Sequence, residues 1–365
     1  MNLYEYIDNY GIYTFEEKPF NEVDSMIFSF LSYADFNQIV GKRKVSLKDV
    51  GRMHLGIHNK KEKNIIAVKE GNKILNYMKD TNRYKNCALF RHEYVGTNDI
   101  QFCAISIEYQ KNKVYVSYEG TDQLISGWKE NLLLGFNFPT DTHKKAIKYL
   151  NHYYTLGFKK IIVGGHSKGG NLALVASMCC NPLVRSKIQT IYNFDGPGLL
   201  DKEFRSKNFK RILPKYAHII PDDSIVGILL HNQKDTVVKA SIKGPLAHDV
   251  AFWEIENNRL KRTKLTSFSK ELRIGLLGYI DSHSAEEMKL IVQNLNKVCL
   301  KANVTSLIEF KEDYHKIIDF ISACSCLDME SRNMLYDLTN VFIKAIGNSK
   351  HKDFMAFIKR FKLDI

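Results

Sequence analysis

One stretch of sequence decides the fold, and it reads Ile161-Ile162-Val163-Gly164-Gly165-His166-Ser167-Lys168-Gly169-Gly170-Asn171-Leu172-Ala173-Leu174. A β-branched apolar run leads into a glycine-rich turn, and good helix formers follow it. Gly165, Ser167 and Gly169 fit the pattern G-x-S-x-G, which is typical of a nucleophile elbow between a strand and a helix. Because that turn is strained, the residues two before and two after the serine must let other backbone pass closely. We therefore interpret Ser167 as a nucleophile rather than as part of a chance Gly-Ser loop.

Strands and helices alternate on both sides of this elbow. Period-two alternation and short β-branched runs predict strands at residues 101–109, 114–118, 160–166, 189–194, 216–220 and 236–240. Apolar residues at helical spacing predict helices at residues 21–33, 141–156 and 172–180, and short helices within residues 41–85. Alternation of this kind favours a mostly parallel sheet in three layers, an α/β-hydrolase fold.

The chain divides into three parts of different character. Residues 1–20 are polar and aromatic and are expected to form an N-terminal arm. Residues 21–265 carry the alternating pattern and form the predicted α/β-hydrolase domain. Residues 266–365 have helical character, with Leu276, Leu277 and Ile280 at helical spacing. We interpret this last part, which shows no acid–base cluster, as a helical cap or an appended subdomain.

The charge balance is strongly basic. The 365 residues include 53 Lys and Arg against 40 Asp and Glu, a formal net charge of +13. Such a surface could favour nucleic acid, anionic membranes or acidic substrates. The charge is spread along the chain and no nucleic-acid motif is recognisable, so a nucleic-acid partner is not expected. A solvated lysine-rich surface is the main interpretation, with peripheral attraction to an anionic lipid surface as the second.

Other features of the composition favour a cytoplasmic protein. No apolar run approaches the roughly 18 residues that span a bilayer, and the first eight residues lack the layout of a secretory signal. The seven cysteines show no disulfide-framework spacing. Cys324 and Cys326 lack partners at zinc-finger spacing, so no metal site is expected. The oligomeric state is left open.

A serine nucleophile needs a histidine base, which follows the serine and the acid in chain order in this fold. Three histidines lie between Ser167 and the helical tail, namely His218, His231 and His248. His218 begins a predicted strand and fits a structural role, and His231 fits a loop. His248 follows the last predicted strand, where the base is expected, and is our predicted catalytic base.

The acid that orients the base should follow a strand between Ser167 and His248. Asp222 and Asp223 end the strand predicted at residues 216–220, and this position favours Asp223 slightly over its neighbour. Asp195 ends the strand before that one and is the alternative, although Asp-Gly-Pro-Gly also has strong turn chemistry. Asp223 is the predicted acid, with Asp222 and Asp195 kept as alternatives.

The tetrahedral intermediate needs backbone N–H donors that form an oxyanion hole. One donor is expected from Lys168, which directly follows the nucleophile. The other is expected from the loop after the strand at residues 114–118, where Gly120-Thr121 is the natural candidate. No metal or cofactor is needed for this chemistry.

Several segments resemble known families. Tyr118-Glu119-Gly120-Thr121-Asp122 with Gly127-Trp128 resembles the F-R-G-T…W oxyanion segment of class 3 lipases, and the elbow resembles their G-H-S-x-G-G. A bacterial lipase-like family of α/β-hydrolases, itself uncharacterised, is more closely similar through four segments: Asn21-Glu22-Val23-Asp24, the elbow with Asn171-Leu172-Ala173, Asp195-Gly196-Pro197-Gly198, and Pro221-x-x-Ser224-x-Val226-Gly227. The resemblance covers roughly residues 20–255. It implies an α/β-hydrolase with Ser167 as nucleophile and with Thr121 and Lys168 at the oxyanion hole.

Two positions depart from the class 3 lipase pattern. Glu119 stands where those lipases carry arginine, so an ion pair made there is not expected in the same form. Their acid segment reads D-x-V-P, whereas Asp223-Ser224-Ile225-Val226-Gly227 is one residue longer and lacks the proline. The choice among the three aspartates therefore stays open.

The sequence as a whole favours a serine hydrolase that cleaves carboxylic esters, most simply lipid or acyl esters, through a Ser-Asp-His triad. A thioesterase with the same triad is an alternative enzyme. A catalytically silent hydrolase fold that binds a partner is the alternative that is not an enzyme, because one fold hosts many functions.

Overall fold

The computed structural model describes residues 1–58, 66–96, 100–121, 137–154, 157–303, 319 and 322–348. In this part of the chain eight strands form one sheet whose spatial order is the chain order. They are β1 (Val45–Ser46), β2 (Ala88–Gly96), β3 (Gln101–Gln110), β4 (Lys113–Tyr118), β5 (Lys160–His166), β6 (Ile188–Phe194), β7 (Tyr216–Pro221) and β8 (Asp235–Val238). Strands β1 to β4 pair antiparallel and β4 to β8 pair parallel. A second small sheet pairs β9 (Ile255–Glu256) with β10 (Arg259–Leu260).

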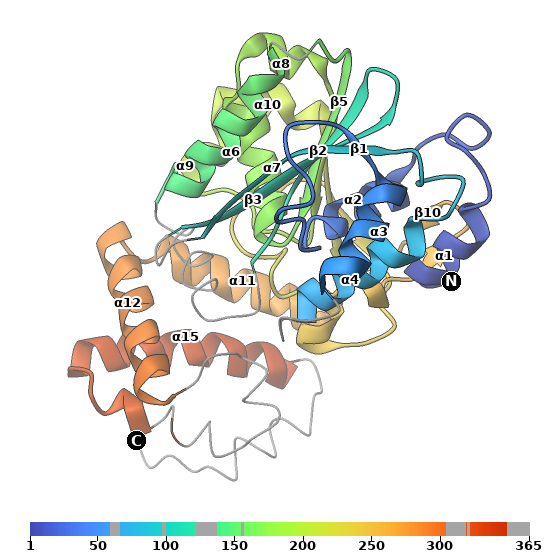
Figure 1. Ribbon diagram of the computed structural model, residues 1–365. Coiled ribbons are helices and arrows are strands. Elements are labelled where there is room, and N and C mark those ends of the chain that lie inside the picture. Colours follow the sequence, from blue (N-terminus) through green and yellow to red (C-terminus); the bar gives the residue numbers. More distant parts are fainter. Residues whose placement is uncertain are drawn as a thin grey trace.

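Helices cover both faces of the large sheet (Figure 1). One face carries α1 (Leu3–Tyr10), α2 (Glu22–Leu31), α3 (Leu47–His58) and α4 (Ile66–Met78). The other carries α6 (Asp141–Asn151), α7 (Lys168–Cys179), α8 (Pro182–Lys187), α9 (Asp201–Phe204) and α10 (Lys207–Ile212), with the short 3₁₀ turns η1 (His152–Tyr154) and η2 (Leu213–Lys215) nearby. The mostly parallel three-layer α/β-hydrolase fold predicted from the sequence is confirmed.

Side-chain alternation along the strands divides the core in two. Tyr115 and Ile162 belong to the cluster under α1, α2 and α4. Their chain neighbours Val116 and Val163 belong to the cluster under α6, α7 and α10. Successive residues of a strand point to opposite faces, so central strands that are apolar throughout supply both layers.

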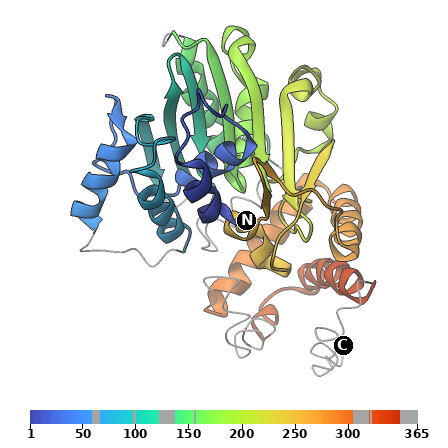
Figure 2. The ribbon, with the colours of Figure 1, turned by 90° about the vertical axis from the view of Figure 1, so that its right-hand side faces the viewer.

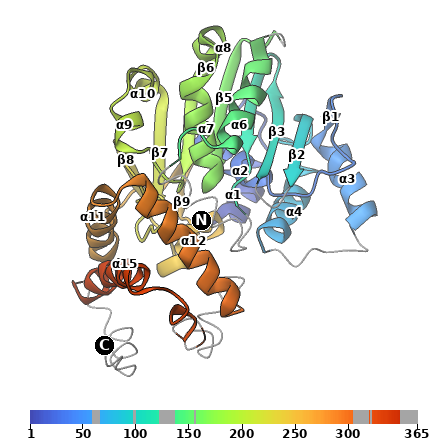
Figure 3. The ribbon, with the colours of Figure 1, turned by 90° about the vertical axis from the view of Figure 1, so that its left-hand side faces the viewer.

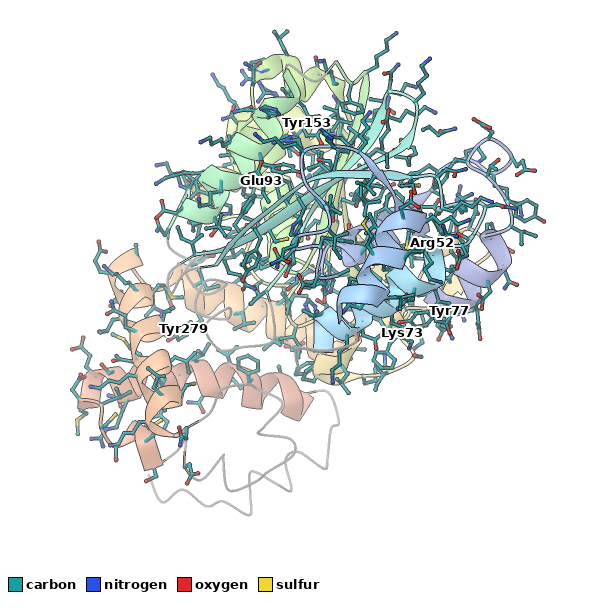
Figure 4. All side chains as sticks on the ribbon, in the orientation of Figure 1. Arg52, Lys73, Tyr77, Glu93, Tyr153 and Tyr279 are labelled. Atoms are coloured by element: carbon teal, nitrogen blue, oxygen red, sulfur yellow. The ribbon has the colours of Figure 1, made fainter. Side chains whose placement is uncertain are left out.

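In the described part of the chain, three longer helices follow the sheet, preceded by the short 3₁₀ turns η3 (Gly244–His248) and η4 (Val250–Phe252). They are α11 (Ser267–Asp281), α12 (Ala285–Lys301) and α15 (Met329–Asn348), and Figures 2 and 3 show them below the sheet, beside the carboxyl ends of the parallel strands. Leu272 and Leu276 of α11 pack with Ile220 and Ile228, so this helix is joined to the sheet by an apolar cluster. Tyr279, labelled in Figure 4, donates a hydrogen bond to the carbonyl of Met334 (2.8 Å) and so links α11 to α15. The helical character predicted for this region is confirmed in its described part.

Two details differ from the sequence-based expectations. Residues 1–20 contain α1, whose Leu3, Tyr6 and Ile7 are fully buried, so this segment packs on the domain instead of forming an arm. The i, i+3, i+4 spacing of these residues and the capping box between Asn2 and Glu5 are helix signals that a polar, aromatic composition conceals. Strand β2 was not expected, because its second half is half-buried or exposed and lacks a clean apolar alternation.

Candidate active site

Ser167 lies in the turn between β5 and α7 with φ 58° and ψ −133°. A positive φ at a residue with a side chain is strained, and such strain clusters at functional sites. The turn is fixed by a hydrogen bond from the backbone N–H of Ser167 to the carbonyl of Phe194 (2.9 Å) and by one from Gly170 to the carbonyl of Ser167 (2.9 Å). The nucleophile elbow expected at this position therefore has the required geometry.

The two flanking glycines lie where the pattern requires small residues. A Cβ added to Gly165 would lie 2.3 Å from the carbonyl carbon of Gly169, and one added to Gly169 would lie 2.1 Å from the carbonyl oxygen of Tyr118. Both neighbours are backbone atoms, which cannot rotate away. The close approach of β4, β5 and α7 therefore depends on the absence of side chains at these positions.

His248 lies at the end of η3, and its ring contacts Asp195 at the end of β6. Nδ1 of His248 is 2.6 Å from Oδ2 of Asp195, which is completely buried and has a φ of 48°. The other oxygen of Asp195 accepts hydrogen bonds from the Ser224 hydroxyl (2.5 Å) and the Gly227 N–H (3.0 Å). An aspartate held in this way can fix the tautomer of a histidine and stabilise its protonated form.

The structure does not bring Asp223 or Asp222 to His248. Asp223 accepts hydrogen bonds from the backbone N–H of Gly244 and from the hydroxyl of Thr266, both at 2.6 Å. Asp222 faces Lys243 (2.6 Å) and Lys239 (3.1 Å), and these hydrogen bonds outweigh the effect of burial and hold its pKa below the usual value. The structure thus pairs His248 with Asp195, the alternative, and not with Asp223, the aspartate that the sequence favoured. Asp222 and Asp223, which follow β7, therefore both contact chain segments that come after β8.

His166, directly before the serine, holds the backbone of the histidine segment. Its Nε2 lies 2.8 Å from the carbonyl oxygen of His248, and its Nδ1 lies 3.1 Å from the hydroxyl of Tyr33. A carbonyl only accepts, so Nε2 carries the proton and Nδ1 accepts from Tyr33. Burial, together with the nearby ring of His248, lowers the pKa of His166 well below its usual value. The two imidazole rings are 4.4 Å apart, so His248 lies beside the elbow.

The expected oxyanion-hole loop also lies against the elbow. A Cβ added to Gly120 would lie 3.1 Å from Cβ of Ser167 and 2.6 Å from the carbonyl oxygen of His166. Thr121 follows directly, whereas Asp122, Gly127 and Trp128 lie outside the described residues. Lys168 is the first residue of α7, where helix N–H groups point outward along the axis. Its side chain is buried, and Nζ donates to the carbonyl of Gln101 (2.8 Å).

The other two histidines have contacts of their own. His218 is buried in β7, with Nδ1 2.7 Å from Asp235 and Nε2 3.1 Å from the carbonyl of Gly196, which fits the structural role expected for it. His231 lies outside the strands, 3.4 Å from Asp281 of α11.

Among the described residues, no group of three or more His, Cys, Asp or Glu could hold a metal ion. None of the described helices is long and apolar enough to cross a membrane.

Sequence reasoning missed the contacts of Ser224, Gly227 and His166. All three lie in motifs that the sequence does display, the P-x-x-S-x-V-G segment and the elbow itself. The signal for Asp195 was present too, since an aspartate ends the strand that directly follows the nucleophile helix. What the sequence lacks is the direction in which each carboxylate turns.

Comparisons with known proteins place the chain in a family. Two solved structures are similar, each at 13% sequence identity: a fungal lipase in complex with an inhibitor (TM-score 0.38, covering 60% of this chain and 78% of that one) and the Rhizomucor miehei lipase propeptide complex (TM-score 0.35, 60% and 68%). Likeness at this level carries no inference about activity. A search of curated proteins gave no match. The Mbeg1-like family matches residues 78–297, more than half of the 365 residues, and the chain belongs to this family.

Proposed function

We propose that the chain is a serine hydrolase that cleaves carboxylic esters, with Ser167 as nucleophile, His248 as general base and then acid, and Asp195 as the group that orients His248. One observation carries the proposal. A buried carboxylate and a histidine meet at 2.6 Å beside a serine in a strained strand-to-helix turn. Asp195 takes the place that the sequence had favoured for Asp223.

The reaction follows from these positions. The Ser167 hydroxyl attacks the ester carbonyl while His248 takes its proton, and His248 then returns that proton to the leaving alcohol. Water next attacks the acyl-enzyme with His248 again as base, which releases the carboxylic acid and restores the serine. The backbone N–H groups of Thr121 and Lys168 are the proposed donors to the oxyanion, and removing such a donor typically costs about 10²–10³ in rate. No metal or cofactor takes part in these steps.

A fluorophosphonate probe tests the proposal directly, because it reacts with activated serines. The wild-type chain should form an adduct that mass spectrometry locates on Ser167. The Ser167→Ala variant should keep its fold and lose the adduct, and His248→Ala should lose the label although the serine is still present. A folded wild-type chain that never labels would instead indicate a silent hydrolase fold that binds a partner.

A panel of substrates then defines the ester. Lipid or acyl esters are the proposed class, and the formal charge of +13 adds a proposed peripheral attraction to anionic lipid surfaces. Ester hydrolysis should rise with acyl chain length and in the presence of anionic vesicles, and fall again at high salt. Preference for acyl thioesters over the matched oxygen esters would favour the thioesterase alternative.

A further inference from the structure

Residues 222–227, between β7 and β8, contact Asp195 and the first residue of the turn that carries His248. Asp222, Asp223 and Ser224 in this segment are buried, with exposed fractions of 3%, 2% and 1%. Within the described residues neither aspartate contacts a histidine ring, although this is where the sequence favoured the acid. The buried polar groups of the segment therefore need another explanation, because burying them without partners would cost stability.

The first set of contacts holds the carboxylate of Asp195 in place. Ser224 and Gly227 both donate to Oδ1 of Asp195, at 2.5 and 3.0 Å. The N–H of Gly227 also lies 3.0 Å from the Ser224 hydroxyl, so the two donors converge on one oxygen. A Cβ on Gly227 would lie 2.3 Å from that same oxygen, which explains why a glycine occupies the position. With Oδ1 occupied in this way, Oδ2 is the oxygen that faces His248.

The second contact fixes the start of the segment that carries the base. Oδ2 of Asp223 accepts a hydrogen bond from the N–H of Gly244 (2.6 Å). Gly244 begins η3 with a φ of +70°, and the same 3₁₀ turn ends at His248. The carboxylate of Asp223 thus anchors one end of a five-residue turn, and the hydrogen bond from His166 to the carbonyl of His248 anchors the other.

The third set of contacts ties the segment to helix α11. Thr266, the N-cap of α11, donates its hydroxyl to Asp223 (2.6 Å) and its N–H to the carbonyl of Asp222 (2.8 Å). One turn later, the buried hydroxyl of Ser269 donates to the carbonyl of Ser224 (2.9 Å). The first turn of α11 therefore holds the segment through three hydrogen bonds.

We propose that the 222–227 segment, held by the first turn of α11, positions Asp195 and His248 against each other, with Ser224 as its central positioning residue. The inference rests on the proposed triad and deepens it. It also gives α11 a part in the site, because the beginning of the helical region fixes the orientation of the acid. Among the described residues, the titratable groups that face His248 are Asp195 from β6, His166 from β5 and the adjacent Asp249.

The test compares Ser224→Ala with Ser106→Ala. Ser106 is an equally buried serine on β3 whose hydroxyl bonds Tyr149 (2.6 Å), far from His248 in the chain. Loss of the Ser224 donor leaves more negative charge on the carboxylate, so the midpoint of the His248 titration, followed by NMR of its ring protons, should move to higher pH. With an ester found in the panel, kcat should fall about 10- to 100-fold with KM little changed, since a hydrogen bond to a charged group is lost. The Ser106 variant should change neither quantity.

The outcomes separate this inference from the proposed function. A folded Ser224→Ala variant with an unchanged His248 titration and unchanged kcat would overturn the positioning role. A shifted titration in a chain whose wild type never labels with fluorophosphonate would reject the hydrolase and leave the positioning role standing. If Ser224→Ala does not fold, Ser269→Ala carries the same test, because it removes only the hydroxyl that holds the carbonyl of Ser224. If the midpoint of the His248 titration in Ser269→Ala equals that of the wild type, the inference is again overturned.

Discussion

Two aspartate–histidine pairs with nearly equal N–O distances, each with one fully buried partner, allow the role of Asp195 to be tested at the scale of single residues. Asp195 lies 2.6 Å from His248 beside the elbow, and Asp235 lies 2.7 Å from His218 within the sheet. The first pair lies beside the elbow that carries Ser167, and the second lies on β7 and β8. The second pair therefore reports what the loss of a buried Asp–His contact does to the fold alone.

Asp195→Asn should reduce kcat on an ester by on the order of 10³–10⁴, because an amide cannot hold the histidine in the tautomer that accepts the serine proton. Asp235→Asn should lower the thermal unfolding midpoint while turnover per folded molecule stays near wild type. Steady-state kinetics with unfolding curves on the same samples separate the two effects. Wild-type turnover in folded Asp195→Asn would exclude this residue as the acid, and Asp223→Asn would then be measured next.

At the scale of the element, α11 contains two glycines with opposite surroundings. A Cβ on Gly278 meets nothing within 4 Å, whereas one on Gly275 would lie 2.6 Å from Cγ1 of Val341 in α15. Alanine is the better helix former by about 0.8–1.0 kcal/mol. Gly278→Ala should therefore stabilise the helix by up to about 1 kcal/mol. Gly275→Ala should instead destabilise the packing of α11 on α15, because a valine branch has little room to move.

Urea unfolding followed by circular dichroism measures both variants against wild type. Two stabilised variants would contradict the close packing of α11 on α15. A Gly278→Ala variant that loses stability would mean that this face of α11 is covered by another part of the chain.

A buried ion pair joins α2 to the chain segment that follows α4. Arg83, just after α4, donates to both oxygens of Asp24 in α2, at 2.8 and 2.6 Å, and both side chains are fully buried. The same carboxylate accepts from the hydroxyl of Tyr84 at 2.7 Å. Removing one partner of such a pair leaves an uncompensated buried charge.

Arg83→Met should destabilise the chain by about 3–5 kcal/mol. Asp24→Asn in the same chain should recover part of that loss, since the orphaned charge is then gone. Equilibrium denaturation of the two single variants and the double variant forms a cycle that measures the coupling. Strictly additive losses would show that the pair acts as two independent contacts.

At the scale of the whole molecule, the sequence allows the layers to be predicted but not the orientation of the acids. Strong period-two and β-branched runs predict β3 to β8, and the helix predicted from residue 21 corresponds to α2, where Asn21 forms a capping box with Asp24. The helix α1 and strand β2 were missed because their burial depends on distant partners. The same limit applies to Asp195 and Asp223. Both follow strands of a parallel sheet, and the difference arises from Ser224, Gly227, Gly244 and Thr266, contacts that only the folded chain brings together.

Two buried histidines, His143 and His166, and the half-buried His92 give the whole molecule a sensitivity to acid. Burial lowers the pKa of His92 and of His143 to about 4, and burial with the neighbouring His248 lowers that of His166 well below its usual value. The unfolded chain binds these protons near the ordinary pKa of about 6.5, whereas the folded chain stays neutral at these sites. Between about pH 6.5 and pH 4 the unfolded state thus holds more protons, so the free energy of unfolding falls as the pH falls.

Each of these histidines should contribute about 1.4 kcal/mol of lost stability per pH unit in that window. His143→Gln tests this for one site, because the ring nitrogens of His143 contact Asn171 and the backbone of Thr140. The substitution should lower stability at pH 7.5 and reduce the loss between pH 7.5 and pH 5, so that the two urea midpoints converge on acidification. Parallel curves for variant and wild type would show that His143 takes up its proton in the folded chain as readily as in the unfolded one.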